Sequence, residues 1–396
     1  MELVLTEEQR LVKESAEKLV ERCGGPLAHR KLRKSDLGFD RKRIKTIAEV
    51  GWLSLMVPEQ SNGLGMGMTE LALALEQAGR GLLTEPVAAL AACARAVSVG
   101  RAATGTGTEQ ELNKLISGEN FLIPVLQDPT ATEENRERIS AEHYHYGYQL
   151  TGIRTCIPFA EEADAFLVDA NTSDGIILIV VPKDTFGITV TGSRMVDGTA
   201  HGTIEFSEVT LMADDLLIAG VKQGENLAAD TYDRLLLGVS AEMLGVMEEA
   251  LELAVSYMRT REQFGRPIGS FQALQHRAVN DHIQVELLRS LLYQVCAAID
   301  AGHGSRMMVA AVKARASEAV LSVTKSVIQM HGAIGFTDEY DAGLYLRRGM
   351  ALASLYGNAA EHRERYRRHS HLSAEKAAEP KKRRKRKQPK KSIFAT

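Results

Sequence analysis

Residues 235–263 read LLLGVSAEMLGVMEEALELAVSYMRTREQ, with apolar residues at almost every third or fourth position. This period predicts a long amphipathic helix. Two more runs with the same period follow, at residues 271–300 and 305–332. Successive long helices rich in Ala, Leu and Met are typical of an antiparallel bundle. We therefore predict a C-terminal four-helix bundle over residues 223–372.

The residues before the bundle carry a different pattern. Short runs rich in Val, Ile, Thr and Phe lie at 121–126, 148–159, 164–170, 175–182, 187–192 and 201–211. Turn signals such as NTSDG, PKDTFG and DGTAHG separate them. Alternation of this kind is typical of strands joined by tight turns. It predicts a middle antiparallel β-domain over residues 121–222.

Helical periodicity also marks residues 1–120, which we expect to form an N-terminal helical domain. Thr6 is the predicted N-cap of the first helix, because Gln9 stands three positions further on. A Gly-rich segment at residues 58–67 reads as a loop, and it lacks the preceding strand that a phosphate-binding loop requires. The order helices, sheet, helices predicts an α+β multidomain fold.

Composition limits the class of protein. The chain has 396 residues, 44% hydrophobic and 25% charged, which fits a globular chain with more than one core. Its four cysteines are far apart and form no CxxC pair, so neither a disulfide scaffold nor a metal site is expected. The charged N-terminus does not read as a secretory signal, and no apolar run is long enough for a transmembrane segment. We expect a cytoplasmic protein.

Charge is unevenly spread along the chain. Residues 373–396 hold 10 Lys and Arg against two acidic residues, while the rest holds 38 basic and 49 acidic residues. The run KKRRKRK at 381–387 predicts a disordered, solvated tail, or else a tether to an anionic surface or partner. The acidic body argues against a specific nucleic-acid ligand.

Two motifs in the predicted bundle indicate a family. The first is Arg261-Glu-Gln-Phe-Gly265, followed by Phe271-Gln-Ala-Leu-Gln275. The second is Gln329-Met-His-Gly-Ala-Ile-Gly-Phe336, followed by Glu339-Tyr340. With both motifs at this separation, the chain resembles the acyl-CoA dehydrogenase family over residues 1–372. The resemblance implies an FAD cofactor, an acyl-CoA substrate desaturated between its α and β carbons, and an electron-transfer flavoprotein as electron acceptor.

The resemblance also implies that these motifs contact the flavin of a neighbouring subunit. The planar guanidinium of Arg261 suits a pyrophosphate. Small residues after Gln329 let the backbone of Gly332 and Ala333 approach the cofactor closely. The expected cofactor-binding residues are Arg261, Phe264, Gln272, Gln329, His331, Gly332 and Ala333.

The segments that would contact the chain's own flavin depart from the family pattern. Family members begin the β-domain with a Thr-Glu-Pro stretch, whereas residues 125–133 read VLQDPTATE. An aromatic residue followed by Ile-Thr normally lies against the flavin ring, and here the match is Thr155-Cys-Ile-Pro158. We expect Cys156 to be a buried structural thiol in preference to a residue that tunes a flavin.

The catalytic base is missing from both family positions. One slot falls on Tyr356, and tyrosine is a poor base at neutral pH. The other slot falls on Leu235. Glu242 lies two helical turns after Leu235 and is the remaining candidate base, although a helix Glu that bonds a neighbouring Arg or a backbone group is the simpler expectation. Asp233 reads as a residue at the start of this helix.

Three functions follow from this pattern of retained and lost residues. The first is the non-catalytic subunit of a heteromeric, steroid-type acyl-CoA dehydrogenase of α2β2 form, which contributes flavin contacts in trans to a homologous catalytic subunit. The second is a homomeric acyl-CoA dehydrogenase with a displaced base such as Glu242. The third is a flavin-free scaffold that uses the basic tail as a tether.

Overall fold

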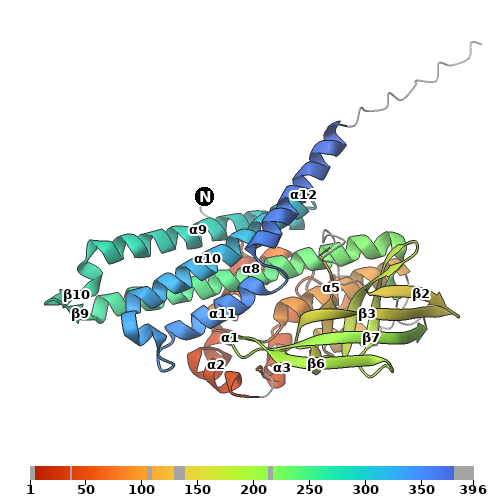
Figure 1. The fold of residues 1–396 in the computed structure, drawn as a ribbon, viewed down its shortest axis with the longest axis horizontal. Helices are drawn as coiled ribbons and strands as arrows, with labels where there is room; N and C mark the ends of the chain where they lie inside the picture. Colours follow the sequence, from red (N-terminus) through yellow and green to blue (C-terminus); the bar gives the residue numbers. More distant parts are fainter. Residues whose placement is uncertain (1–4, 36–37, 105–108, 129–138, 213–216, 379–396) are drawn as a thin grey trace, which may run out of the picture.

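The computed structural model describes residues 5–35, 38–104, 109–128, 139–212 and 217–378. Its N-terminal part is helical, as predicted (Figure 1). Thr6 caps the first helix in a capping box with Gln9, which confirms the predicted start. The helices are α1 (Glu7–Cys23), α2 (Pro26–Arg33), α3 (Arg41–Glu49), α4 (Met68–Arg80), α5 (Val87–Thr104) and α6 (Glu109–Ile116).

The middle part is one sheet, with strand order β6-β7-β3-β2-β4-β5-β8 and β1 beside β4. Most neighbours are antiparallel as predicted, whereas β1 runs parallel to β4 and one parallel bridge joins β2 to β4. The strands are β1 (Leu122–Val125), β2 (Ser140–Tyr144), β3 (Gly147–Pro158), β4 (Ala165–Thr172), β5 (Gly175–Pro182), β6 (Ile188–Arg194), β7 (Ala200–Met212) and β8 (Leu217–Ala219).

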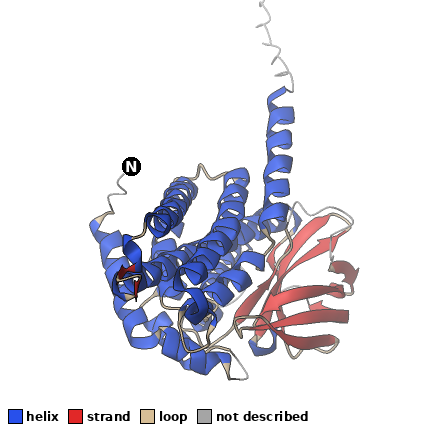
Figure 2. Ribbon diagram, turned by 60° about the vertical axis from the view of Figure 1, so that its left-hand side comes forward, coloured by secondary structure: helices blue, strands red, loops and turns tan. Residues whose placement is uncertain are grey.

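The C-terminal part is again helical and lies beside the sheet (Figure 2). Its helices are α8 (Val221–Thr260), α9 (Gln272–Asp300), α10 (Arg306–His331), α11 (Ala342–Ser354) and α12 (Ala359–Ala378). Because α8 begins at Val221, Asp233 lies well inside it, and the expectation that Asp233 starts the helix is wrong. Helix α12 continues past position 373, where we expected the tail to begin, and residues 381–387 lie outside the described part of the chain.

Helices α4 and α8 cross at two glycines. A Cβ on Gly245 would overlap the carbonyl oxygen of Glu76, and a Cβ on Gly79 would overlap that of Glu242. The absence of side chains at both positions lets the two backbones touch. This close approach fixes α4, from the N-terminal part, against the longest helix of the bundle.

We expect Gly245→Ala to lower the free energy of unfolding by about 1–3 kcal/mol, because overpacking forces the two helices apart. Urea denaturation measures the change. Gly220→Ala is the matched control, since an added Cβ there meets no atom within 4 Å. Equal stability of Gly245→Ala and the unmodified protein would contradict the close contact.

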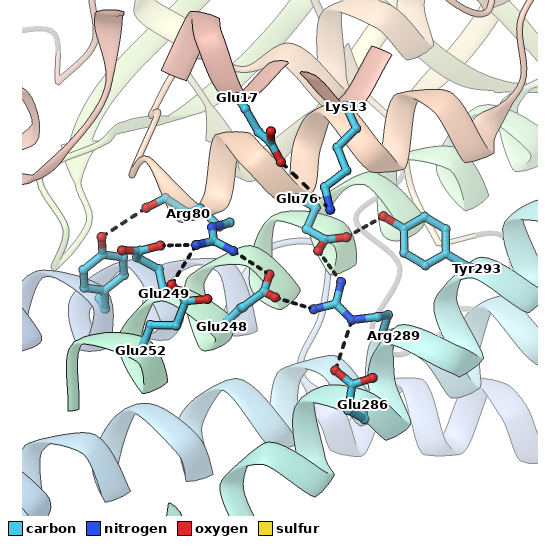
Figure 3. A network of polar contacts seen from close by, with 11 residues as sticks. Lys13, Glu17, Glu76, Arg80, Glu248, Glu249, Glu252, Glu286, Arg289 and Tyr293 are labelled. Carbon is cyan, nitrogen blue, oxygen red and sulfur yellow. Dashed lines mark hydrogen bonds and ion pairs between the residues drawn. The ribbon is translucent and has the colours of Figure 1, made fainter. Parts of the chain in front are cut away.

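A polar network joins the same helices (Figure 3). Arg80 on α4 contacts Glu248, Glu249 and Glu252 of α8. Arg289 on α9 contacts Glu248 at 2.8 Å and also pairs with Glu76 of α4. Acidic side chains therefore outnumber basic ones in this network, and two arginines hold three helices together.

Within the described ranges, no helix is long and apolar enough to cross a membrane. In the same residues, His, Cys, Asp and Glu side chains form no group that could hold a metal ion.

Candidate functional site

The two sequence motifs lie at the same end of the bundle, because the ring of Tyr257 on α8 lies 4.7 Å from that of His331, which ends α10 (Figure 1). Arg261 ends α8, and the hairpin of β9 (Glu262–Gln263) and β10 (Arg266–Pro267) projects beyond it. Phe264, at the hairpin turn, has a φ of 55° and is 90% exposed. Burying a side chain of this size is worth about 1.5–3 kcal/mol, so its exposure marks a surface suited to another molecule.

Six of the seven predicted cofactor residues are exposed at this end of the bundle: Arg261, Phe264, Gln272, Gln329, Gly332 and Ala333. The Arg261 guanidinium has no partner among the residues that the structure describes. An added Cβ at Gly332, which has a φ of 68°, would meet no atom within 4 Å. The surface therefore offers a free cation and an open backbone, both suited to a phosphate group.

The seventh residue, His331, lies beneath this surface. Its ring is buried between Tyr257, at a centroid distance of 4.7 Å, and Tyr340, at 4.8 Å. Its Nδ1 lies 2.8 Å from the carbonyl oxygen of Val327, and burial lowers its pKa. His331 thus packs the C-terminal end of α10 against α8 and supports the exposed residues that follow it.

A separate cavity of about 550 Å³ lies between the sheet and α12. The stretch of α8 from Tyr232, which lines this cavity, to Arg261 is about 43 Å long at the ordinary rise of an α-helix. A single dinucleotide is too short to reach from Arg261 to this cavity. Among the residues that the structure describes, seventeen line the cavity: Leu126, Gln127, Asp128, Arg154, Thr155, Cys156, Ile157, Tyr232, Ser354, Tyr356, Gly357, Ala360, Glu361, His362, Glu364, Arg365 and Arg368.

Cys156 lines this cavity and is exposed, so the expectation of a buried thiol is wrong. The pairing of β3 with β7 shifts register between Arg154 and Ile157, and Cys156 has a φ of 56° there. A bulge of this kind redirects side chains out of the sheet. Of the predicted departures at residues 125–133, only positions up to Asp128 lie within the described residues.

A buried arginine, Arg365, closes one wall of the cavity. Its Nη2 donates to Asp233 at 2.6 Å, and its Nε lies 3.4 Å from Asp128. Its guanidinium also lies over the ring of Tyr232. Sequence reasoning missed this group, because Arg365 stands in a run of charged residues that reads as a solvated helix.

Tyr356 occupies the expected base position, where its side chain is half-buried and lines the cavity. Burial raises its pKa, so it stays protonated and accepts no proton at neutral pH. Its carbonyl accepts a hydrogen bond from the Tyr232 hydroxyl at 3.0 Å. The next carbonyl, of Gly357, accepts from the buried ammonium of Lys313 at 2.9 Å. These contacts fix the turn that carries Tyr356.

Glu242 is buried and paired. Arg348 Nη2 donates to its Oε2 at 2.8 Å, while Nη1 of the same arginine donates to Asp197 at 2.9 Å. Glu242 borders a cavity of only about 40 Å³, room for about one water molecule. Leu235, the other family position, is fully buried. The structure thus pairs Glu242 with an arginine, one of the two simpler expectations for this residue.

We expect Glu242 to make the stability of the folded protein depend on pH. Burial raises the pKa of its carboxyl from near 4.5 to about 6, although Arg348 opposes the shift. The folded protein then binds this proton more tightly than the unfolded chain, so stability falls as pH rises from about 4.5 to about 6. Urea unfolding across this range should show the unmodified protein losing stability relative to Glu242→Gln. A difference that stays constant with pH would contradict the shift.

Comparisons with known proteins agree with this architecture. Residues 6–119 match the model of the acyl-CoA dehydrogenase N-terminal domain, and residues 223–371 match that of the C-terminal domain. The chain is 30% identical over 333 residues to acyl-CoA dehydrogenase FadE27 of Mycobacterium tuberculosis, covering 81% of this chain and 85% of the relative.

Solved structures show the same fold. The ChsE4–ChsE5 complex of Mycobacterium tuberculosis aligns with a TM-score of 0.83 at 27% identity, covering 96% of this chain and all of the compared chain. The Tcur3481–Tcur3483 steroid ACAD aligns with a TM-score of 0.83 at 25% identity, covering 93% and 99%. The aligned regions include both helical parts and the sheet between them.

Proposed function

The chain belongs to the acyl-CoA dehydrogenase family, and on that premise we propose that it is the non-catalytic subunit of a heteromeric, FAD-dependent enzyme that desaturates an acyl-CoA thioester. A homologous catalytic subunit holds the flavin ring and supplies the base in an α2β2 assembly. A steroid or another bulky acyl chain is the proposed substrate. Two of the similar structures are named as pairs of unlike subunits, and one of these is named a steroid ACAD.

One observation carries the proposal: the outward-facing motif is intact, while the chain's own cavity has no carboxylate in the base position. Arg261 and Phe264 face away from the chain that carries them. Tyr356 stands where a base is needed, and its phenol is protonated. A subunit of this kind supplies residues to a neighbour's site and does not catalyse a reaction in its own cavity.

The exposed residues fit the dinucleotide part of FAD. Arg261 would donate hydrogen bonds to the pyrophosphate, and Phe264 would cover an apolar part of the cofactor. The side chain of Gln329 and the open backbone at Gly332 and Ala333 would bind the adenylate end. When bound, the flavin accepts the hydride that leaves the β-carbon of the thioester. The proposed electron acceptor from the reduced enzyme is an electron-transfer flavoprotein.

A homomeric enzyme that uses Glu242 as its base is less well supported. The carboxylate already accepts from Arg348, and its cavity of about 40 Å³ has no room for an acyl chain. A flavin-free scaffold would rely on the basic run at 381–387, which lies outside the described residues. We retain a cytoplasmic location as part of the proposal.

Purification with and without a partner tests the proposal. The partner is a homologous subunit that carries Glu before the Gly matching Gly357. We expect the chain alone to be colourless and inactive, and the pair to show a flavin spectrum and α,β-desaturation of acyl-CoA. Yellow, active protein from this chain alone would refute the proposal. Failure of every homologous partner to yield flavin would favour the scaffold.

A further inference from the structure

The 550 Å³ cavity contains two buried guanidinium groups with unused hydrogen-bond donors. Arg154 is 3% exposed, and its Nη2 donates to Asp169 at 3.1 Å. Arg365 is 1% exposed, and its Nη1 has no partner in the described part of the chain. The Nε and Nη1 of Arg154 are also without a partner among the described residues. Leaving a buried donor unpaired destabilises the folded protein, so such groups call for a bound acceptor.

The two arginines flank one short segment of the cavity wall. Asp169, the partner of Arg154, also accepts from the backbone N–H of Gln127 at 3.3 Å. The next residue, Asp128, lies 3.4 Å from Arg365 Nε. The N-terminus of α12, where Ala360 lines the same cavity, adds the positive end of a helix dipole.

The acidic residues around the cavity already have partners. Asp128, Asp169 and Asp233 lie against the two buried arginines. Glu361 accepts from the backbone N–H of Asn358 at 2.8 Å. Glu364 pairs with Arg367 and Arg368 on the outer part of α12. The unused capacity at the two arginines therefore belongs to donors, which an oxyanion would satisfy. His362, also in the lining, adds one acceptor, Nδ1, that is unpaired among the described residues, because its Nε2 donates to the Tyr356 carbonyl.

We propose that this cavity binds a small organic anion, whose carboxylate or phosphate accepts hydrogen bonds from Arg154 and Arg365. The apolar part of the ligand would lie against Leu126 and Ile157, which line the same space. The volume is within the range of about 300–1,000 Å³ usual for small-molecule sites. The inference rests on the proposed function in one respect: the chain's own flavin does not fill the cavity.

Cys156 gives a direct readout, because its exposed thiol lines the cavity. The probes are inorganic phosphate and phenylacetate, added separately to the full chain, with mass spectrometry following alkylation by iodoacetamide. At a ligand concentration of about ten times the dissociation constant, we expect alkylation of Cys156 to slow roughly tenfold. Cys23, which is partly exposed and outside the cavity lining, serves as the internal control.

Variants separate binding from folding. Arg154→Gln should lose the protection, whereas Arg363→Gln should keep it, because Arg363 pairs with exposed Glu318 and does not line the cavity. If Arg154→Gln fails to fold, Arg154→Lys preserves the charge and should give weaker protection, because a lysine cannot reproduce the planar donor set. Equal protection in Arg154→Lys and the unmodified chain would overturn the role of Arg154.

The outcomes distinguish the ligand source and the two proposals. Protection by only one probe identifies phosphate or carboxylate as the group that binds. Protection by neither probe, in a colourless chain, overturns this inference and leaves the proposed function intact. Protection by added FAD, with a flavin spectrum from the chain alone, overturns both.

Discussion

Arg348→Met is expected to lower the free energy of unfolding by about 3–5 kcal/mol, the largest stability effect predicted for this chain. Its side chain is buried and donates to Glu242 on α8, to Asp197 in the β6–β7 turn and to the Leu83 carbonyl, which is 3.3 Å away. Its loss leaves two buried carboxylates without a cation. Since native proteins are stable by only about 5–15 kcal/mol, urea unfolding should register the change clearly.

The neighbouring arginine is the matched control. Arg347 pairs with exposed Asp338 at 3.0 Å, so Arg347→Gln should change stability by less than about 1 kcal/mol. Adding Glu242→Gln to Arg348→Met should recover part of the loss, because one uncompensated carboxylate is removed. If Arg348→Met unfolded at the same urea concentration as the unmodified protein, the ion pairs of Arg348 with Glu242 and Asp197 would not stabilise the fold as predicted.

Arg261→Gln should weaken flavin binding by the assembled heteromer about 10- to 100-fold. A hydrogen bond to a charged group is worth about 1.5–3 kcal/mol, and about 1.4 kcal/mol corresponds to a factor of ten. Equilibrium dialysis of the flavin from the complex measures the loss. The flavin affinity of the Arg261→Lys complex should fall between those of the unmodified and the Arg261→Gln complexes, because lysine keeps the charge but cannot donate in a bidentate manner.

Arg259→Gln is the control for this effect, since Arg259 is also exposed near the end of α8 but lies outside the motif. It should leave the flavin affinity unchanged. Assembly of the two subunits, followed by size-exclusion chromatography, should be the same for both variants. An Arg261→Gln complex that binds flavin within twofold of the unmodified complex would argue against the contact in trans.

The sequence predicted features that depend on local pattern. Helical periodicity located the long helix of the bundle, and the Thr6–Gln9 pair located the start of α1. These predictions succeed because a helix repeats its faces along the chain. The family resemblance led us to group Arg261 with Gln329. The ring contact between Tyr257 and His331 places the ends of their helices together, and the cofactor role of both residues stays a prediction.

The predictions that failed depend on contacts between distant residues. Asp233 meets Arg365 across 132 positions, and no local signal pairs them. Cys156 is exposed because a register shift between β3 and β7 turns it outward, and the alternation within one strand does not reveal that shift. The pairing of Glu242 is not among the failures, since an arginine was one of its expected partners, but only the fold identifies that partner as Arg348, 106 positions away.

The ratio of flavin to protein in the purified heteromer tests most directly whether this chain contributes flavin contacts only to its neighbour. The absorbance of released FAD, divided by the amount of each subunit, gives this ratio. If this chain completes its neighbour's site and holds no flavin ring of its own, each pair of unlike subunits binds one flavin. One flavin in every subunit, with this chain's own cavity occupied, would contradict the account.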